Sequence, residues 1–75
     1  MYIYEIKLAN KISGSFIEIR DTFAKSFRGV FHTNAFRRLK KLKRKMDRIE
    51  VRRVYKKKTL ELGTRVVSDI LYEEE

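Results

Sequence analysis

The sequence predicts a small α+β domain in which an N-terminal β-hairpin precedes two or three helices. Apolar residues alternate with polar ones near the N-terminus, which is typical of half-buried strands. After residue 22 the apolar residues recur every three or four positions, which is typical of helices. The 75 residues suffice for a single domain. We divide it into a hairpin over residues 1–21 and a mainly helical region over residues 22–72.

The expected hairpin has strands at residues 2–8 and 16–20, joined by a turn. Its turn contains residue types that favour reversals of the chain, namely Asn10, Ser13, Gly14 and Ser15. Alternation sorts the first strand into two faces, with Tyr2, Tyr4, Ile6 and Leu8 on one and Ile3, Glu5 and Lys7 on the other. The second strand would carry Ile17 and Ile19 on one face and Phe16, Glu18 and Arg20 on the other.

The first expected helix begins near Thr22, with Asp21 or Thr22 as its N-cap, because a short side-chain oxygen can accept an unpaired backbone N–H. Its apolar face would carry Phe23, Phe27, Val30 and Phe31. Gly29 weakens a helix, so residues 29–33 are alternatively a turn or a third short strand.

The strongest pattern is a central helix that is both amphipathic and basic. Thr33 and Asn34 form an N-cap pair. The apolar residues after them are spaced by three or four positions: Phe36, Leu39, Leu42, Met46 and Ile49. Residues 49–58 fit either a helix or a strand. A last helix would carry Val66, Val67, Ile70 and Leu71 and end in a frayed acidic tail at residues 73–75.

Positive charge is concentrated in one stretch of the chain. Thirteen of the 19 basic residues lie between Arg37 and Lys58, where Asp47 and Glu50 are the only acids, so this stretch carries 13 − 2 = +11. The other residues carry 6 − 8 = −2, which accounts for the formal net charge of +9. A concentrated positive field attracts a polyanion and weakens in salt, so nucleic acid is the first partner to expect.

On a helix, one set of basic residues would lie opposite the apolar stripe and contact phosphates: Arg37, Lys41, Arg44, Lys45, Arg48 and, if the helix continues, Arg52. Arg can direct two N–H donors to one phosphate, while Lys acts as a mobile point charge. We predict the principal contacts to be Arg37, Lys41, Arg44, Lys45, Arg48, Arg52 and Arg53. Flanking electrostatic support would come from Arg38, Lys40, Lys56, Lys57 and Lys58.

The predicted function is nucleic-acid binding. DNA is favoured because a helix fits its major groove better than the deep, narrow groove of duplex RNA, and a transcriptional regulator would be one such protein. The alternative is an interaction module or inhibitor that docks on an acidic protein surface, and a third is an RNA-binding component of a ribonucleoprotein. A membrane-binding helix would need the apolar face that the core requires. We expect the acidic tail to be a solubilising end, although it could compete with nucleic acid for the basic helix.

Composition excludes several other classes. The chain has no Cys, which rules out disulfides and thiolate metal sites, and a single His, which rules out a His-based metal cluster within one chain. It contains no phosphate-binding loop or catalytic triad motif, so we expect no enzyme activity, cofactor or metal. No apolar run approaches the ~20 residues that cross a bilayer, and no signal peptide is evident, so we expect a cytoplasmic protein. Because so short a chain buries little surface alone, we also expect a homodimer.

Overall fold

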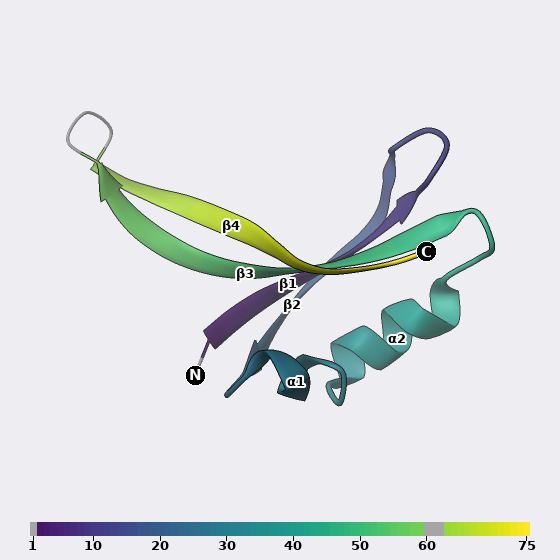
Figure 1. Cartoon of the computed structure of the whole chain (residues 1–75), viewed down its shortest axis with the longest axis horizontal. Helices are drawn as coiled ribbons and strands as arrows, with labels where there is room; N and C mark the ends of the chain where they lie inside the picture. The colour runs from purple at the N-terminus through teal and green to yellow at the C-terminus, as the bar shows by residue number, and fades with distance from the viewer. Residues whose placement is uncertain (1, 60–62) are drawn as a thin grey trace.

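The structure is a computed structural model that describes the backbone of residues 2–59 and 63–75 and the side chains of residues 2–55 and 69–75. Over these residues the chain forms a four-stranded antiparallel sheet and two short helices (Figure 1). The elements are β1 (Tyr2–Asn10), β2 (Phe16–Ala24), α1 (Phe27–Val30), α2 (Asn34–Leu42), β3 (Asp47–Thr59) and β4 (Gly63–Glu74). In the sheet the strands follow the order β2-β1-β3-β4, so that β1 and β3 are central.

The hairpin predicted at the N-terminus is confirmed, but the face predicted for Phe16 is wrong, because a register shift between Leu8 and Ala9 puts it on the same face as Ile19 rather than with Glu18 and Arg20. β1 and β2 pair antiparallel from Tyr2 opposite Ala24 to Ala9 opposite Phe16. In the turn, the Asn10 side-chain oxygen accepts the N–H groups of residues 12 and 13 at 3.0 and 2.9 Å. β2 continues past residue 20, so the helix expected from Thr22 is wrong there, and residues 31–33 form a turn after the single turn of α1.

The prediction that helices follow the hairpin is wrong for most of residues 22–72. The central helix ends at Leu42 instead of continuing toward Ile49, and residues 49–58 lie in a strand. Ile49 and Val51 alternate with charged residues, and β-branched side chains suit a pleated surface. Pairing with β1 over eight positions, from Ile3 opposite Val54 to Asn10 opposite Asp47, stabilises the strand.

The last predicted helix is also wrong, because these residues form β4. The register with β3 shifts between Val51 and Arg52, with Tyr72 opposite the first and Ile70 opposite the second, so that Leu71 is an extra residue. A bulge interrupts the alternation of a strand, and the adjacent apolar pair at 70 and 71 therefore resembles a helical stripe in the sequence. Residues 73 and 74, expected in a frayed tail, are the last residues of β4.

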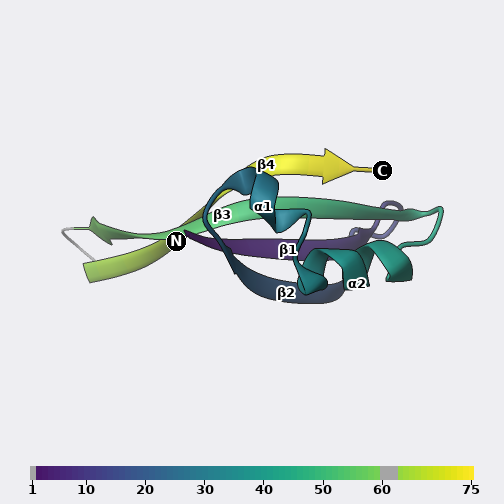
Figure 2. The ribbon, with the colours of Figure 1, turned by 90° about the horizontal axis from the view of Figure 1, so that it is seen from below.

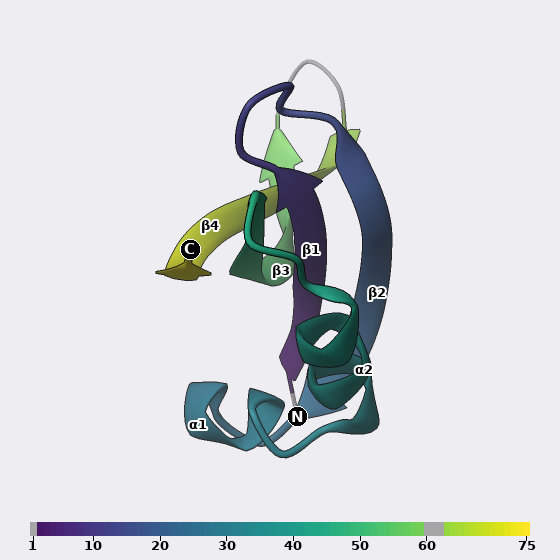
Figure 3. The same ribbon diagram turned by 90° about the vertical axis from the view of Figure 1, so that its right-hand side faces the viewer.

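Both helices pack on the same side of the sheet, as Figure 2 and Figure 3 show. The predicted cap of the central helix is confirmed, since the Thr33 hydroxyl accepts the Phe36 N–H at 3.3 Å. The sheet and helices enclose one apolar cluster: Tyr4, Ile6, Leu8, Ala24, Val30, Phe36, Leu39, Ile49 and Val51. Next to this cluster, the ring of Phe31 meets those of Phe27, Phe36 and Tyr72 edge-on at centroid distances of 5.2, 4.9 and 5.0 Å, which joins both helices to β4.

Strand alternation gives the sheet two different faces. The covered face meets the helices and carries Tyr4, Ile6 and Leu8 of β1, in agreement with the face predicted for them. The open face carries Ile3, Glu5 and Lys7 of β1, and no helix of the described part of the chain lies over it (Figure 1). Within the described residues, no helix has the length and apolar character that would let it span a membrane.

Candidate nucleic-acid interface

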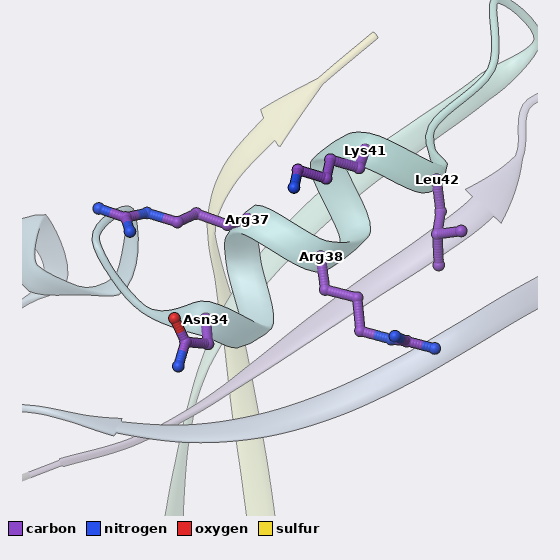
Figure 4. A pocket seen from close by; sticks show the side chains of 5 residues that line it. All are labelled: Asn34, Arg37, Arg38, Lys41 and Leu42. Carbon is purple, nitrogen blue, oxygen red and sulfur yellow. The ribbon is translucent and has the colours of Figure 1, made fainter.

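Helix α2 presents basic side chains to solvent because its other side is held in the core. Phe36 and Leu39 are buried against the sheet, while Arg37 and Lys41, one helical turn apart, are exposed. Figure 4 shows Arg37 and Lys41 leaving the helix in the same direction, whereas Arg38 turns toward β2. An open hollow of about 530 Å³ lies beside them, lined by Asn34, Arg37, Arg38, Lys41 and Leu42.

The loop from Lys43 to Met46 continues this basic character and is held in place by backbone hydrogen bonds. The buried carboxylate of Asp47 accepts the Arg44 N–H at 2.9 Å, and the Asp47 N–H donates to the Arg44 carbonyl at 3.0 Å. The N–H of Lys11, in the β1–β2 turn, donates to the Met46 carbonyl at 2.7 Å. The loop therefore has a defined conformation with Arg44 and Lys45 exposed.

We define the basic surface as the seven basic residues of α2 and this loop, among which no acid intervenes: Arg37, Arg38, Lys40, Lys41, Lys43, Arg44 and Lys45. Two of them have acidic partners, since Arg38 lies 3.7 Å from Glu18 and Lys40 pairs with Glu74. In the part of the chain that the structure describes, the other five have no carboxylate within 4.0 Å. Five positive groups therefore remain available to an anionic ligand.

The Lys40–Glu74 pair connects the end of β4 to α2. The hydrogen bond from Lys40 lowers the pKa of the Glu74 carboxyl, and the same bond raises the pKa of the Lys40 ammonium. The Tyr72 hydroxyl also donates to Glu74 at 3.2 Å, while burial, followed by that hydrogen bond, raises the pKa of Tyr72. An acid of the C-terminal segment thus neutralises one cation of the basic surface.

The structure separates the predicted contact residues rather than placing them on one helix. Arg48 and Arg52 lie on the open face of the sheet, where their guanidinium groups bind the Glu50 carboxylate at 2.9 and 3.3 Å. Arg53 lies on the covered face, beyond the helices, with its guanidinium 4.3 Å from the ring centre of Tyr2. The expectation that Arg48 and Arg52 share a helical face with Arg44 is wrong, because the helix ends at Leu42. Of the two alternatives for residues 49–58 the strand is present, and it puts Arg52 and Arg53 on opposite faces.

The side chains of Lys56, Lys57 and Lys58 lie outside the described residues, although their backbone belongs to β3. Two basic residues near the interface were missed as contacts by the sequence prediction. Lys43 was left out although it lies within the basic stretch, and Lys11 is brought next to the loop by its hydrogen bond to Met46. No local sequence signal links residues 11 and 46, because their proximity follows from the sheet pairing.

The exposed cations of the basic surface can bind an anion electrostatically. In residues 2–59 and 63–75, no three His, Cys, Asp or Glu side chains come together as metal ligands would. The single histidine, His32, is exposed in the turn between the helices. The chain matches no protein-family model, no curated protein and no solved structure, so its function is inferred from its own residues.

Proposed function

We propose that this protein binds nucleic acid, DNA in the first place, through the basic surface. The observation that carries the proposal is the local charge of the region from Arg37 to Lys45, where seven of nine residues are basic and none is acidic. The buried side of α2 and the hydrogen-bonded loop also fix where the charges lie, which reduces the entropy lost on binding.

Phosphates would be the main contacts in this mode of binding. Arg37 and Arg44 can each direct two N–H donors to one phosphate, and Lys41 can follow the backbone as a flexible point charge. An α-helix with its side chains is ~10–12 Å across, which suits a major groove ~12 Å wide, and α2 is nine residues long. A regulator of transcription located in the cytoplasm is the biological role that we attach to this proposal.

The test is a direct comparison of ligands over a range of salt. Fluorescently labelled random duplex DNA, a matched RNA hairpin and a single strand are titrated with the purified protein from about 50 to about 300 mM salt. We expect the tightest binding to duplex DNA, with log K falling by about 0.9 per phosphate contacted for each unit of log salt. Tightest binding to the RNA hairpin would replace DNA by RNA, and feeble binding to all three would favour an acidic protein partner.

A pair of charge-reversal variants locates the binding surface. Arg37→Glu/Lys41→Glu should weaken DNA binding on the order of 100-fold, because two contacts are lost and two repulsions are added. Lys25→Glu/Arg28→Glu is the matched control, since it changes the net charge equally at exposed positions outside the basic surface. Equal losses in both variants would mean that the overall charge, rather than the basic surface, determines binding.

A further inference from the structure

The open face of the sheet exposes large apolar side chains together. Ile3 lies opposite Phe23 across the β1–β2 pairing, and Ile70 lies opposite Arg52 across the β3–β4 pairing. The ammonium group of Lys7 lies 4.6 Å from the ring centre of Phe16, which places that ring on the same face. The exposed apolar residues of this face are Ile3 (39%), Phe16 (56%), Ile19 (46%), Phe23 (63%) and Ile70 (46%). Large apolar side chains exposed on one face of a small domain are typical of an interaction site.

The centre of the open face is charged but electrically balanced. Glu5 lies opposite Arg52, and Lys7 lies opposite Glu50, so acids and bases alternate both along and across β1 and β3. Ion pairs within the chain link Lys7 to Glu5 at 3.2 Å, and Glu50 to both of its arginine neighbours. Burial of this face would therefore leave none of these central charges without a partner.

Where β1 pairs with β3, the open face is nearly neutral in a strongly basic protein. Among the described side chains, register and alternation place on it three bases, Lys7, Arg48 and Arg52, and four acids, Glu5, Asp21, Glu50 and Glu73. These seven sum to 3 − 4 = −1, whereas the whole chain has a formal net charge of +9. Positions 56 and 58 continue the alternation of β3 beyond its pairing with β1, and their side chains lie outside the described residues. A polyanion gains little from such a face. Two copies of so basic a chain repel each other through their net charge, and through the central part of this face they can approach with less of that penalty.

We propose that the open face is the interface of a homodimer. A face-to-face dimer has its two-fold axis in the plane of the interface, so each copy presents the same surface to the other. With the axis across the strands, Glu5 of each copy meets Lys7 of the other, and Arg52 meets Glu50. With the axis along the strands, Glu5 meets Arg52 and Lys7 meets Glu50. The alternating charges of β1 and β3 are thus self-complementary in either orientation, and Asp21 and Glu73 on the flanking strands lie outside this pattern.

The size of the face is sufficient for such a dimer. Four strands spaced ~4.8 Å apart, with about nine residues at ~3.4 Å each, give a face of roughly 19 by 30 Å. Two such faces bury roughly 1,100 Å², which is above the ~1,000 Å² expected of a specific interface. The two apolar ends of the face, at Phe23 with Ile3 and at Phe16 with Ile19, would supply most of the affinity.

The experiment is sedimentation equilibrium of the full chain, without nucleic acid, at protein concentrations up to roughly 100 μM. We expect the wild type to have twice the chain mass of 9.1 kDa. Phe23→Glu and Ile19→Glu should each shift the mass to that of the monomer, because they place a charge in the centre of the apolar contact. Ile12→Glu is the control, since Ile12 is 76% exposed in the β1–β2 turn, outside the face.

Each outcome decides the proposal. A monomeric wild type would overturn it and leave the face to a different protein. A dimer that persists in both Phe23→Glu and Ile19→Glu would also overturn it, because association would then use another surface such as the edge of β2 or β4. Circular dichroism confirms that each variant is folded, and if one is not, the other decides. Because no nucleic acid is present, the result is independent of the proposed function.

Discussion

The two faces of the sheet are built from the same strands but have different chemistry. On β1, Tyr4, Ile6 and Leu8 enter the core beneath the helices, while the residues between them remain on the open face. The covered side is apolar inside and carries the basic surface on the outside of α2. The open side combines exposed apolar side chains with balanced charges. The comparison shows that a short sheet can offer two surfaces to two different kinds of partner.

Separation of charge between the two sides keeps the two proposed interactions from competing. In these two proposals, a polyanion would be attracted to the side that carries α2, and association of like chains would use the side where charge is balanced. If both proposals hold, a dimer through the open faces places its two basic surfaces on opposite outer sides. Such a dimer would bring two segments of nucleic acid together, which a single chain with one basic surface would not do.

Two buried acids of β3 show how the covered side and the open side differ in the way they treat positive charge. Asp47 and Glu50 are both almost fully buried, at 3% and 5% exposure. Asp47 points to the covered side and organises the basic loop through its hydrogen bond to the Arg44 N–H. Glu50 points to the open side and neutralises Arg48 and Arg52. Asp47 therefore orders the loop that exposes Arg44 and Lys45, whereas Glu50 neutralises the two arginines beside it.

The largest expected difference between the faces is in stability. Leu39→Ala removes a fully buried side chain of α2 and should lower the free energy of unfolding by about 3 kcal/mol. Ile19→Ala, on the open face, should lower it by less than about 1 kcal/mol in dilute solution, because the side chain is already half-exposed. Urea denaturation monitored by circular dichroism measures both values.

The stability comparison also connects with the proposed dimer. At high protein concentration the effect of Ile19→Ala should grow, because the unfolding equilibrium then includes dissociation. The effect of Leu39→Ala should be much the same at every concentration. Equal destabilisation by the two variants in dilute solution would show that the side chains of the open face are packed within a single chain rather than exposed.

Replacement of the two buried acids, Asp47 and Glu50, should affect DNA affinity differently. Asp47→Ala should weaken DNA binding about fivefold, or about 1 kcal/mol, because the loop carrying Arg44 and Lys45 loses the acceptor that orders it. Glu50→Ala adds the same charge on the open face and should leave binding unchanged or slightly tighter. Fluorescence titration with duplex DNA at a fixed salt concentration measures both.

Asp47→Asn separates loop geometry from charge. The asparagine side chain keeps an oxygen that can accept the Arg44 N–H, while the net charge rises as it does in Asp47→Ala. We therefore expect Asp47→Asn to bind DNA at least as tightly as the wild type. If the alanine and asparagine variants bind equally well, the order of the loop is irrelevant, and simple electrostatic attraction accounts for the affinity.

The sequence was a good guide where local preference and tertiary structure agree. The alternation of β1, the turn chemistry around Asn10 and the Thr33 cap are local features, and each is present as predicted. The concentration of basic residues is also local, and it marked Arg37 through Lys45 before the fold was known. These features need no information about distant partners.

The parts of the fold that were predicted wrongly depend on contacts between residues far apart in the sequence, which no local pattern indicates. Residues 36–49 have a continuous helical period, but β1 offers backbone hydrogen bonds to Ile49 and Val51, and these override the helical preference. The bulge near Leu71 imitates a helical stripe in β4. Because the helix ends early, Arg48 and Arg52 are carried to the opposite face, and the open face itself could not be foreseen from a helical interpretation.

The smallest expected effect concerns the contact that reaches from β4 to the basic surface. Glu74 neutralises Lys40, so Glu74→Gln should release one more cation for phosphate binding. DNA affinity should rise about two- to fivefold at low salt, and the slope of log K against log salt should steepen by about 0.9. The wild-type pair also links binding to acidity, because protonation of Glu74 would have the same effect on Lys40.

Glu73→Gln is the control for this last comparison, because it changes the net charge equally but lies on the open face, opposite Glu50. The DNA affinity of Glu73→Gln, and its slope of log K against log salt, should match those of the wild type. The stability that the Lys40–Glu74 pair contributes is present above the ordinary glutamate pKa of 4.5 and is lost as the pH falls through the lowered pKa of Glu74. Thermal unfolding of Glu74→Gln should lack this acid dependence, whereas Glu73→Gln should retain it. Equal gains in DNA affinity from both variants would assign the effect to overall charge and remove Lys40 from the interface.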